Sequence, residues 1–256
     1  MCPASLPPSV EAMSTETPIA VVTGASRGLG YALADALSEA DYRLVIDARD
    51  PVALEAAAAS LASAHGWRVT AIAGDIADPA HRGELAAAAA DLGGASLLIN
   101  NAGTLGASPL PALADYPAGD LLAAFEVNVV APIALTQLLL PDLRRLGGAV
   151  LSVTSDAAVE AYAGWGGYGA AKAALEQACN VLAAEESAVR VWWVDPGDLR
   201  TRMHQEAFPG EDISDRPLPQ TAAPAFLRLI RERLPSGRYR AADLRPARVS
   251  TGGATA

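Results

Sequence analysis

The chain has 256 residues, of which 51% are hydrophobic and 19% charged, so it can build one large α/β domain or two small ones. Its formal net charge of −10 argues against nucleic acid or an anionic membrane as the main partner, because phosphate groups select basic patches. The two cysteines, Cys2 and Cys179, are far apart, which argues against a disulfide framework and favours a cytoplasmic location. No apolar run reaches the roughly 18 residues of a membrane-spanning helix, so no membrane partner is expected.

The two ends of the chain differ in composition from its body. Residues 1–17 are rich in Pro and Ser and lack the basic and apolar regions of a signal peptide, so we expect a disordered leader, with Met13 as a second candidate start. Residues 245–256 are expected to form a disordered tail. Because no repeat or linker divides residues 18–244, we expect a single domain there.

Short apolar runs alternate with Ala- and Leu-rich stretches of helical length along this domain. The runs are apolar on both faces, as is typical of strands in a buried parallel sheet. Helices are expected to begin at Asp50-Pro51 and Asp78-Pro79, where an N-cap acid precedes a proline. The pattern predicts an α/β fold, a single Rossmann-like doubly wound parallel sheet with helices on both faces and ligands at the carboxyl ends of the strands. The predicted strands are residues 19–23, 43–47, 68–74, 96–100, 148–154 and 189–195, and 236–244 forms the last.

A glycine-rich turn, TGASRGLG, runs from Thr23 to Gly30 between the first predicted strand and its helix. Glycines there let backbone amides approach a pyrophosphate at the helix N-terminus. At the end of the second predicted strand, Asp47 favours NAD(H) by binding a ribose 2′-hydroxyl, whereas Arg49 favours the 2′-phosphate of NADP(H). Arg27, inside the turn, adds a second cation. These residues alone leave the choice of dinucleotide open.

Lys172 is the only lysine of the chain, and Tyr168 precedes it by four residues. On a helix, positions i and i+4 share one face, so the two side chains are expected to project together. A nearby ammonium favours the ionised phenol and can lower its pKa by roughly 1–3. The pair is therefore typical of a proton-transfer site, and we expect the pKa of Tyr168 to lie below that of free tyrosine.

Several motifs occur in a fixed order over about residues 18–201. After the glycine turn come NNAG at 100–103, VNVVAP around Asn128, Ser155 placed 13 residues before Tyr168, YxxxK at 168–172, and DPGDLRT at 195–201. In this order they resemble the short-chain dehydrogenase/reductase family. Three of the four asparagines in the chain, Asn100, Asn101 and Asn128, fall in these motifs.

The resemblance implies an oxidoreductase that transfers a hydride between a nicotinamide and a ketone or aldehyde. It implies that Tyr168 is the general acid/base, Lys172 tunes it and binds the ribose, and Ser155 donates a hydrogen bond to the substrate oxygen. Asn128 would hold a water that resupplies the proton. The alternative is a non-catalytic NADP(H)-binding sensor or scaffold with the same fold.

The resemblance also implies which residues bind the cofactor. The NAD-selecting acid of the family falls at Ala48, and Arg49 occupies the next position, where NADP-dependent members often carry arginine. NADP(H) is therefore expected, with NAD(H) as the less favoured cofactor. The implied cofactor-binding residues are Gly24, Ser26, Arg27, Gly28, Leu29, Gly30, Arg49, Asp75, Ile76, Asn101, Ala102, Gly103, Tyr168, Lys172, Pro196, Gly197, Leu199 and Thr201.

Substrate selection is expected in two irregular segments, residues 156–167 and 198–220. Within the first, Trp165 either walls a bulky substrate or packs under the active-site helix or against a second subunit. No metal site is expected, because the three histidines lie on different predicted elements. The Ala-rich face of the helix that carries Tyr168 suits packing between subunits, so a homodimer or homotetramer is expected.

Overall fold

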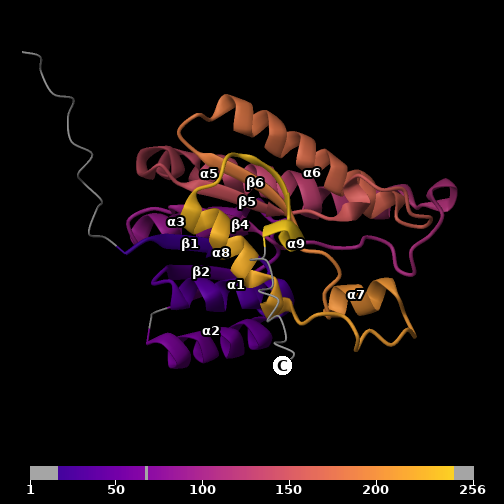
Figure 1. Cartoon of the computed structure of the whole chain (residues 1–256), viewed down its shortest axis with the longest axis horizontal. Coiled ribbons are helices and arrows are strands. Elements are labelled where there is room, and N and C mark those ends of the chain that lie inside the picture. Colours follow the sequence, from indigo (N-terminus) through magenta and orange to yellow (C-terminus); the bar gives the residue numbers. More distant parts are fainter. Residues whose placement is uncertain (1–16, 67–68, 245–256) are drawn as a thin grey trace, which may run out of the picture.

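The computed structural model describes residues 17–66 and 69–244, in which seven parallel strands form one sheet of order β3-β2-β1-β4-β5-β6-β7 (Figure 1). Val22 of β1 pairs with Ile46 of β2 on one side and with Ile99 of β4 on the other, so the strand order reverses between β1 and β4. The α/β, doubly wound fold is confirmed. The strands are β1 (Ile19–Val22), β2 (Arg43–Ala48), β3 (Val69–Ala73), β4 (Leu97–Asn100), β5 (Ala149–Val153), β6 (Arg190–Asp195) and β7 (Gly237–Arg240).

Two helices begin at the predicted Asp-Pro caps. Asp50 accepts hydrogen bonds from the amides of Val52 and Ala53, and Asp78 accepts one from the amide of Ala80. The α-helices are α1 (Gly28–Glu39), α2 (Pro51–His65), α3 (Pro79–Asp91), α4 (Ala118–Phe125), α5 (Ala131–Leu146), α6 (Gly166–Glu185), α7 (Arg202–Ala207), α8 (Ala223–Glu232) and α9 (Ala241–Leu244). A π-helical turn, η2 (Glu126–Val130), joins α4 to α5, and short 3-10 turns are η1 (Leu113–Asp115), η3 (Asp156–Ala158) and η4 (Pro219–Thr221).

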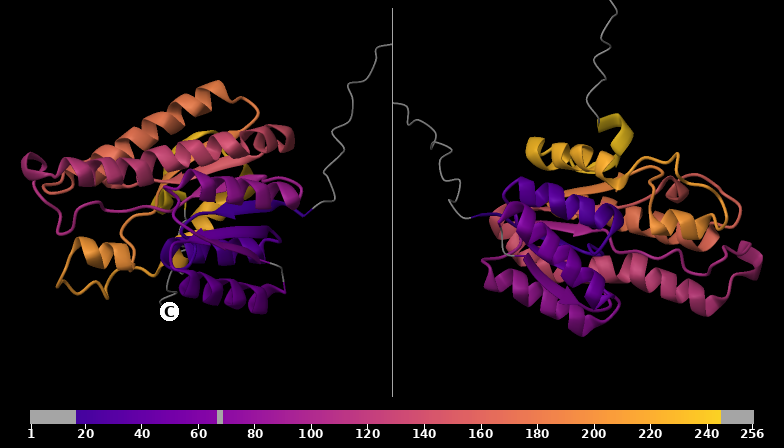
Figure 2. Two further views of the ribbon diagram at one scale, coloured as in Figure 1. Left: turned by 180° about the vertical axis from the view of Figure 1, so that it is seen from behind. Right: turned by 90° about the horizontal axis from the view of Figure 1, so that it is seen from below.

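Two hydrophobic cores lie on opposite faces of the sheet, since successive side chains of a strand point to opposite faces. Val22 packs with α1, α2 and α8 in the first core, whereas its neighbour Val21 packs with α3, α5 and α6 in the second. Figure 2 shows the two helical layers from behind and from below. Because both faces are covered, the carboxyl ends of the strands are left as the open edge. Figure 1 shows α7 beyond that edge.

The last predicted strand, 236–244, is too long. Only Gly237–Arg240 is β7, and Ala241–Leu244 forms α9. Ala241 and Leu244 are buried, so a helical turn places both apolar side chains against the core. The predicted leader, apart from Thr17, and the predicted tail lie outside the described residues, so the domain boundaries stay predictions.

Within the described ranges, one helical stretch, Ala118–Leu146, is long and apolar enough to cross a membrane by length and composition. It joins α4, η2 and α5 end to end, which corrects the expectation that no stretch reaches this length. Core helices of water-soluble proteins can have the same length and composition. Leu135, Leu139 and Leu143 of α5 are buried in the core beside α3 and α6.

Candidate active site

A cavity of about 490 Å³ lies along the carboxyl ends of the central strands. All of the predicted cofactor-binding residues line it, together with Ser155. The glycine turn lines one part of it and the pair Tyr168 and Lys172 another, and the segment that follows β6 reaches the glycine turn through Thr201. The fold thus brings residues from across the sequence to one site at the strand switch point, where doubly wound folds bind ligands.

The glycine turn has the backbone of a phosphate-binding loop. Gly24 and Gly28 have positive φ angles of 66° and 60°, which favour glycine. A Cβ atom on Gly30 would lie 2.3 Å from the carbonyl oxygen of Gly24, so only glycine lets α1 start this close to the turn. No side chain in the described part of the chain caps the first amides of α1. The turn therefore fits the pyrophosphate of a dinucleotide.

Asp47 holds this turn from the end of β2. Its Oδ1 accepts a hydrogen bond from the amide of Gly24 at 2.7 Å, and its Oδ2 lies 3.1 Å from Nε2 of His81 on α3. Asp47 is 2% exposed. Both of its oxygens are engaged inside the protein, which makes Asp47 a structural anchor of the turn. This contact was not expected from the sequence, where Asp47 stood only as a candidate for the ribose.

Asn101 holds the same turn from the side of β4. Its Nδ2 donates to the carbonyl oxygens of Thr23 at 2.8 Å and of Gly24 at 3.1 Å. The hydroxyl of Thr23 in turn accepts hydrogen bonds from the amides of Asn101 and Ala102, both at 3.0 Å. The NNAG motif thus fixes the glycine turn, in addition to lining the cavity.

The predicted adenosine end of the cavity, beside the carboxyl end of β2, carries two arginines. Arg27 lies 3.4 Å from Asp50 in an exposed ion pair. Arg49 lines the cavity, is exposed, and makes no ion pair within residues 17–66 and 69–244. Ala48, beside it, presents no acid to a ribose hydroxyl. This end therefore offers cations to a 2′-phosphate.

Tyr168 and Lys172 lie on α6 and are both buried, at 8% and 4% exposure. The Nζ of Lys172 donates to the carbonyl oxygen of Val153 at 2.8 Å and lies 5.6 Å from the centre of the Tyr168 ring. Tyr168 and Lys172 thus lie on the same face of α6, as predicted. The only lysine of the chain is held against the end of β5, beside the phenol.

The surroundings shift the pKa values of both Lys172 and Tyr168, and the shift for Tyr168 is opposite to the predicted one. Burial lowers the pKa of Lys172 to about 8. Burial also raises the pKa of Tyr168 above its ordinary value, and the carboxylate of Asp156 raises it further, while the neighbouring Ser155 hydroxyl acts in the opposite direction. The expected lowering of the Tyr168 pKa is therefore wrong for the cofactor-free chain, because burial and the Asp156 carboxylate raise this pKa more than the Ser155 hydroxyl lowers it.

Asn128 lies in the π-helical turn η2 and is fully buried. Its Oδ1 accepts from the amide of Thr104 at 3.0 Å, and its Nδ2 donates to the carbonyl of Thr104 at 2.8 Å. The side chain is thus occupied in holding the loop after NNAG. Asn128 does not line the cavity, although Gly103, its neighbour in space, does. Its predicted role in holding a water stays a prediction.

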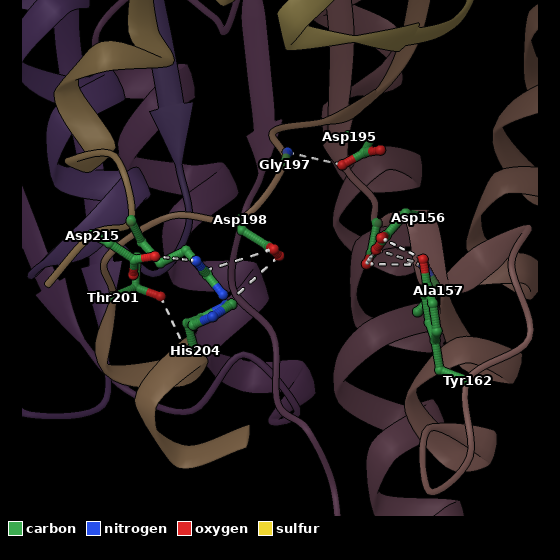
Figure 3. Close-up of polar contacts among 11 residues, drawn as sticks. Asp156, Ala157, Tyr162, Asp195, Gly197, Asp198, Thr201, His204 and Asp215 are labelled. Atoms are coloured by element: carbon green, nitrogen blue, oxygen red, sulfur yellow. Dashed lines mark hydrogen bonds and ion pairs between the residues drawn. The ribbon is translucent and has the colours of Figure 1, made fainter. Parts of the chain in front are cut away.

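Ser155 starts the 3-10 turn η3 at the end of β5. Its hydroxyl donates to Oδ1 of Asp156 at 2.9 Å, and Oδ2 of Asp156 accepts from the hydroxyl of Tyr162 at 3.0 Å. Figure 3 shows Asp156, Ala157 and Tyr162 on one side of the site and Asp198, Thr201 and His204 on the other. The sequence predicts that residues 156–167 select the substrate, but no sequence feature identifies Asp156 as a functional residue.

The segment after β6 covers the other side of the cavity. Thr201 lies over the glycine turn, where a Cβ on Gly28 would be 3.7 Å from its methyl group, and it caps α7 by accepting from the amide of His204. Trp165 lines the cavity and packs edge-on against Tyr168, with ring centres 5.7 Å apart. That it contacts a bulky substrate stays a prediction. The sequence analysis did not identify Leu105, in the loop after NNAG, or Met203, on α7, although both line the cavity; neither belongs to a motif.

No group of three or more His, Cys, Asp or Glu side chains in the described residues is arranged to hold a metal ion. His65 and His81 instead contact Asp35 and Asp47, respectively. His204 stacks with Phe208 at 4.9 Å between ring centres.

Residues 18–212 match the sequence profile of the short chain dehydrogenase family. The chain belongs to this family. Membership places it among the NAD(P)-dependent oxidoreductases. Sepiapterin reductase of Meriones unguiculatus is 36% identical over 201 residues, which are 74% of this chain and 77% of that protein.

Two further members show how far the likeness extends. The rhamnolipids biosynthesis 3-oxoacyl-(acyl-carrier-protein) reductase of Pseudomonas aeruginosa is 37% identical over 198 residues, covering 72% of this chain and 74% of that protein. A solved short-chain dehydrogenase of Escherichia coli CFT073, complexed with NADPH, matches with a TM-score of 0.82 and 28% identity over 88% of this chain and 97% of that one. The short-chain dehydrogenase fold thus accounts for nearly all of the described residues.

Proposed function

We propose that the protein is an NADPH-dependent carbonyl reductase with Tyr168 as its general acid. One observation carries the proposal: the buried pair Tyr168 and Lys172 lines the same cavity as the glycine turn. A non-catalytic binding protein would need the turn but not a phenol and an ammonium at the far end. Ser155, at the same end, supports the reductase because its hydroxyl suits the oxygen of a carbonyl substrate.

The cofactor, when bound, supplies the hydride that the carbonyl carbon gains. Tyr168 gives its phenolic proton to the carbonyl oxygen, which leaves a phenolate that solvent reprotonates. Ser155 donates a hydrogen bond to the same oxygen while negative charge develops there. Lys172 stabilises the phenolate by its charge and offers further N–H donors to a ribose. Trp165, Leu105 and Met203 exclude water from the reacting end.

The preference for NADPH is supported by three features of the adenosine end. Arg49 lines the cavity without an ion pair in the described ranges, Ala48 supplies no carboxylate, and Asp47 is buried with both oxygens engaged. The NADPH complex of the related Escherichia coli enzyme agrees with this choice. The names of the relatives point to different substrates, a pterin-type compound and a 3-oxoacyl thioester, so we propose only a ketone or aldehyde.

The test is NADPH oxidation against a broad carbonyl panel, with Tyr168→Phe beside wild type. The substitution removes one oxygen and almost no volume, so NADPH binding should persist while turnover falls by about 10²–10⁴ or more. Tyr31→Phe is the matched control, because Tyr31 contacts Ser60 on the surface and does not line the cavity. Wild-type turnover by Tyr168→Phe would falsify the mechanism. Tight NADPH binding without turnover on any carbonyl would favour a sensor.

Self-association is a second part of the proposal. Val130, Leu138 and Val181 are exposed on η2, α5 and α6, at 45%, 50% and 45%. Between α5 and α6 lies a cavity of about 350 Å³ with mostly apolar side chains. We propose that a second copy of the chain covers this face, and light scattering of wild type and Leu138→Arg would test it: a monomeric wild type contradicts the proposal. The predicted cytoplasmic location stays a prediction.

A further inference from the structure

The active site holds a carboxylate that the proposed mechanism does not use. Asp156 follows Ser155 directly and lines the cavity. We propose that Asp156 is a positioning residue that holds the Ser155 hydroxyl and, by its negative charge, favours the protonated phenol of Tyr168 that carbonyl reduction needs. This inference rests on the proposed function, because it assigns a role to Asp156 in that same proton transfer.

Three neutral donors fix the Asp156 carboxylate. Its Oδ1 accepts from the hydroxyl of Ser155 at 2.9 Å and from the amide of Ala157 at 2.8 Å, and its Oδ2 accepts from the hydroxyl of Tyr162 at 3.0 Å (Figure 3). Asp156 makes no ion pair with any residue in the described part of the chain. Its charge is therefore held in place without being neutralised by a neighbouring cation.

The contact with Ser155 has a direct consequence for the substrate. A serine hydroxyl has one proton, and in this structure that proton is donated to Asp156. The oxygen of Ser155 also accepts from the amide of Ala157 at 3.2 Å, which fixes its position. To donate to a carbonyl oxygen, Ser155 must rotate its O–H bond away from Asp156 and toward the cavity. An oxygen on which negative charge develops competes for this proton better than a neutral alcohol does.

Charged groups of both signs surround Tyr168. Lys172 faces it from the same helix, while Asp156 faces it from η3 and Asp195 from the end of β6. Burial, Asp156 and Asp195 all raise the pKa of Tyr168. Arg238 of β7 lies 3.9 Å from Oδ2 of Asp195, and it donates to the carbonyl of Ser155 at 3.2 Å and to Glu176 at 2.9 Å. The other charged residues that line the cavity are Arg27, Asp47, Arg49, Asp50, Asp75, Asp198, Arg202, His204 and Glu206.

The two directions of the reaction need different states of Tyr168. Reduction needs the phenol, which gives its proton to the carbonyl oxygen, whereas oxidation needs the phenolate, which takes the proton of the alcohol. A carboxylate that disfavours the phenolate therefore raises the pH at which the rate of reduction falls. It also raises the pH at which the rate of oxidation increases. Asp156 is placed to do this because it accepts the hydroxyl proton of Ser155 and lines the same cavity as Tyr168.

The decisive variant is Asp156→Asn, which keeps the size and one acceptor oxygen but removes the charge. Glu160→Gln is the matched control, because Glu160 is an exposed acid four residues along the same segment and makes no hydrogen bond to Ser155. We would measure kcat/KM against pH in both directions. Tyrosinate absorbance of the cofactor-free proteins, taken as the difference from the same protein with Tyr168→Phe, reports the pKa of Tyr168 directly.

We expect Asp156→Asn to lower the pKa of Tyr168 by about 1 in both measurements, as removal of one nearby like charge does. Below that pKa, alcohol oxidation should then be about tenfold faster, and the reduction rate should start to fall at lower pH. An unchanged pKa, or an equal change in Glu160→Gln, overturns the role of Asp156. Such a result leaves the proposed function intact if Tyr168→Phe is still inactive, so the two failures are distinguishable.

Discussion

The amide of Gly24 donates a hydrogen bond to the carboxylate of Asp47 at 2.7 Å, which ties the first glycine of the turn to the end of β2. His81 of α3 holds the other oxygen of Asp47 at 3.1 Å. A Cβ on Gly74 would lie 2.2 Å from the His81 ring, so the ring is packed as closely as a glycine allows. The shape of the turn therefore depends on a buried contact between three elements.

Asp47→Ala should reduce both stability and cofactor binding. It removes the acceptor of two buried groups, so the free energy of unfolding should fall by about 3 kcal/mol. NADPH affinity should fall as well, because the amide of Gly24 loses its anchor. Urea unfolding and cofactor titration measure the two effects. Asp35→Ala is the control, since Asp35 pairs with His65 nearer the surface and should cost less than about 1 kcal/mol. Equal losses in both variants would contradict the structural role of Asp47.

The His81–Asp47 pair should make stability depend on pH. The hydrogen bond to Asp47 raises the pKa of His81 in the folded protein, although burial opposes it. A folded pKa above the unfolded value, about 6.5, means that the contribution is complete below that pH and is lost as pH rises through the folded pKa. The difference in free energy of unfolding between wild type and His81→Gln should therefore shrink with rising pH. A difference that stays constant from pH 6 to 9, or grows, contradicts this assignment.

Arg49→Asp should weaken the preference for NADPH over NADH. A charge-assisted hydrogen bond to the 2′-phosphate would become a repulsion, so the ratio of the two affinities should fall by about tenfold or more. Fluorescence titration with each cofactor measures this ratio. Arg231→Asp makes the same charge change on α8, outside the cavity, and should leave the ratio unchanged. If wild type binds NADH at least as tightly as NADPH, the assignment of Arg49 is wrong.

Trp165→Ala should change substrate preference by size. The indole lines the cavity and packs against Tyr168 and Phe208, with ring centres 5.7 and 5.8 Å away. Its removal enlarges the reacting end, so kcat/KM should rise for bulky carbonyls relative to small ones. Phe208→Ala provides the comparison, because Phe208 contacts the same ring without lining the cavity. An equal loss of kcat/KM for all substrates, with a lower melting temperature in both variants, would show that Trp165 stabilises the fold and does not select substrates.

The sequence by itself determined the features that depend on local backbone and on strand order. The apolar runs predict a parallel sheet, and the Asp-Pro pairs predict where α2 and α3 begin. The glycine turn, NNAG and DPGDLRT follow the carboxyl ends of strands, as the structure has them. These features follow from short-range rules of turn, cap and strand patterning. The same rules failed at Ala241–Leu244, where burial against the core selected a helix.

Only the tertiary structure decided what several of these side chains do. From the sequence, Asp47 was a candidate to bind the ribose. In the structure, Gly24 and His81 of α3 engage its two carboxylate oxygens, so that it anchors the glycine turn. Lys172 was expected to lower the pKa of Tyr168, but the packing around α6 buries the phenol and η3 places the Asp156 carboxylate near it, and both raise that pKa. Spacing along the chain tells which residues share a helix face. Desolvation and the distances between charges depend on segments far apart in sequence, and these set the electrostatics of the site.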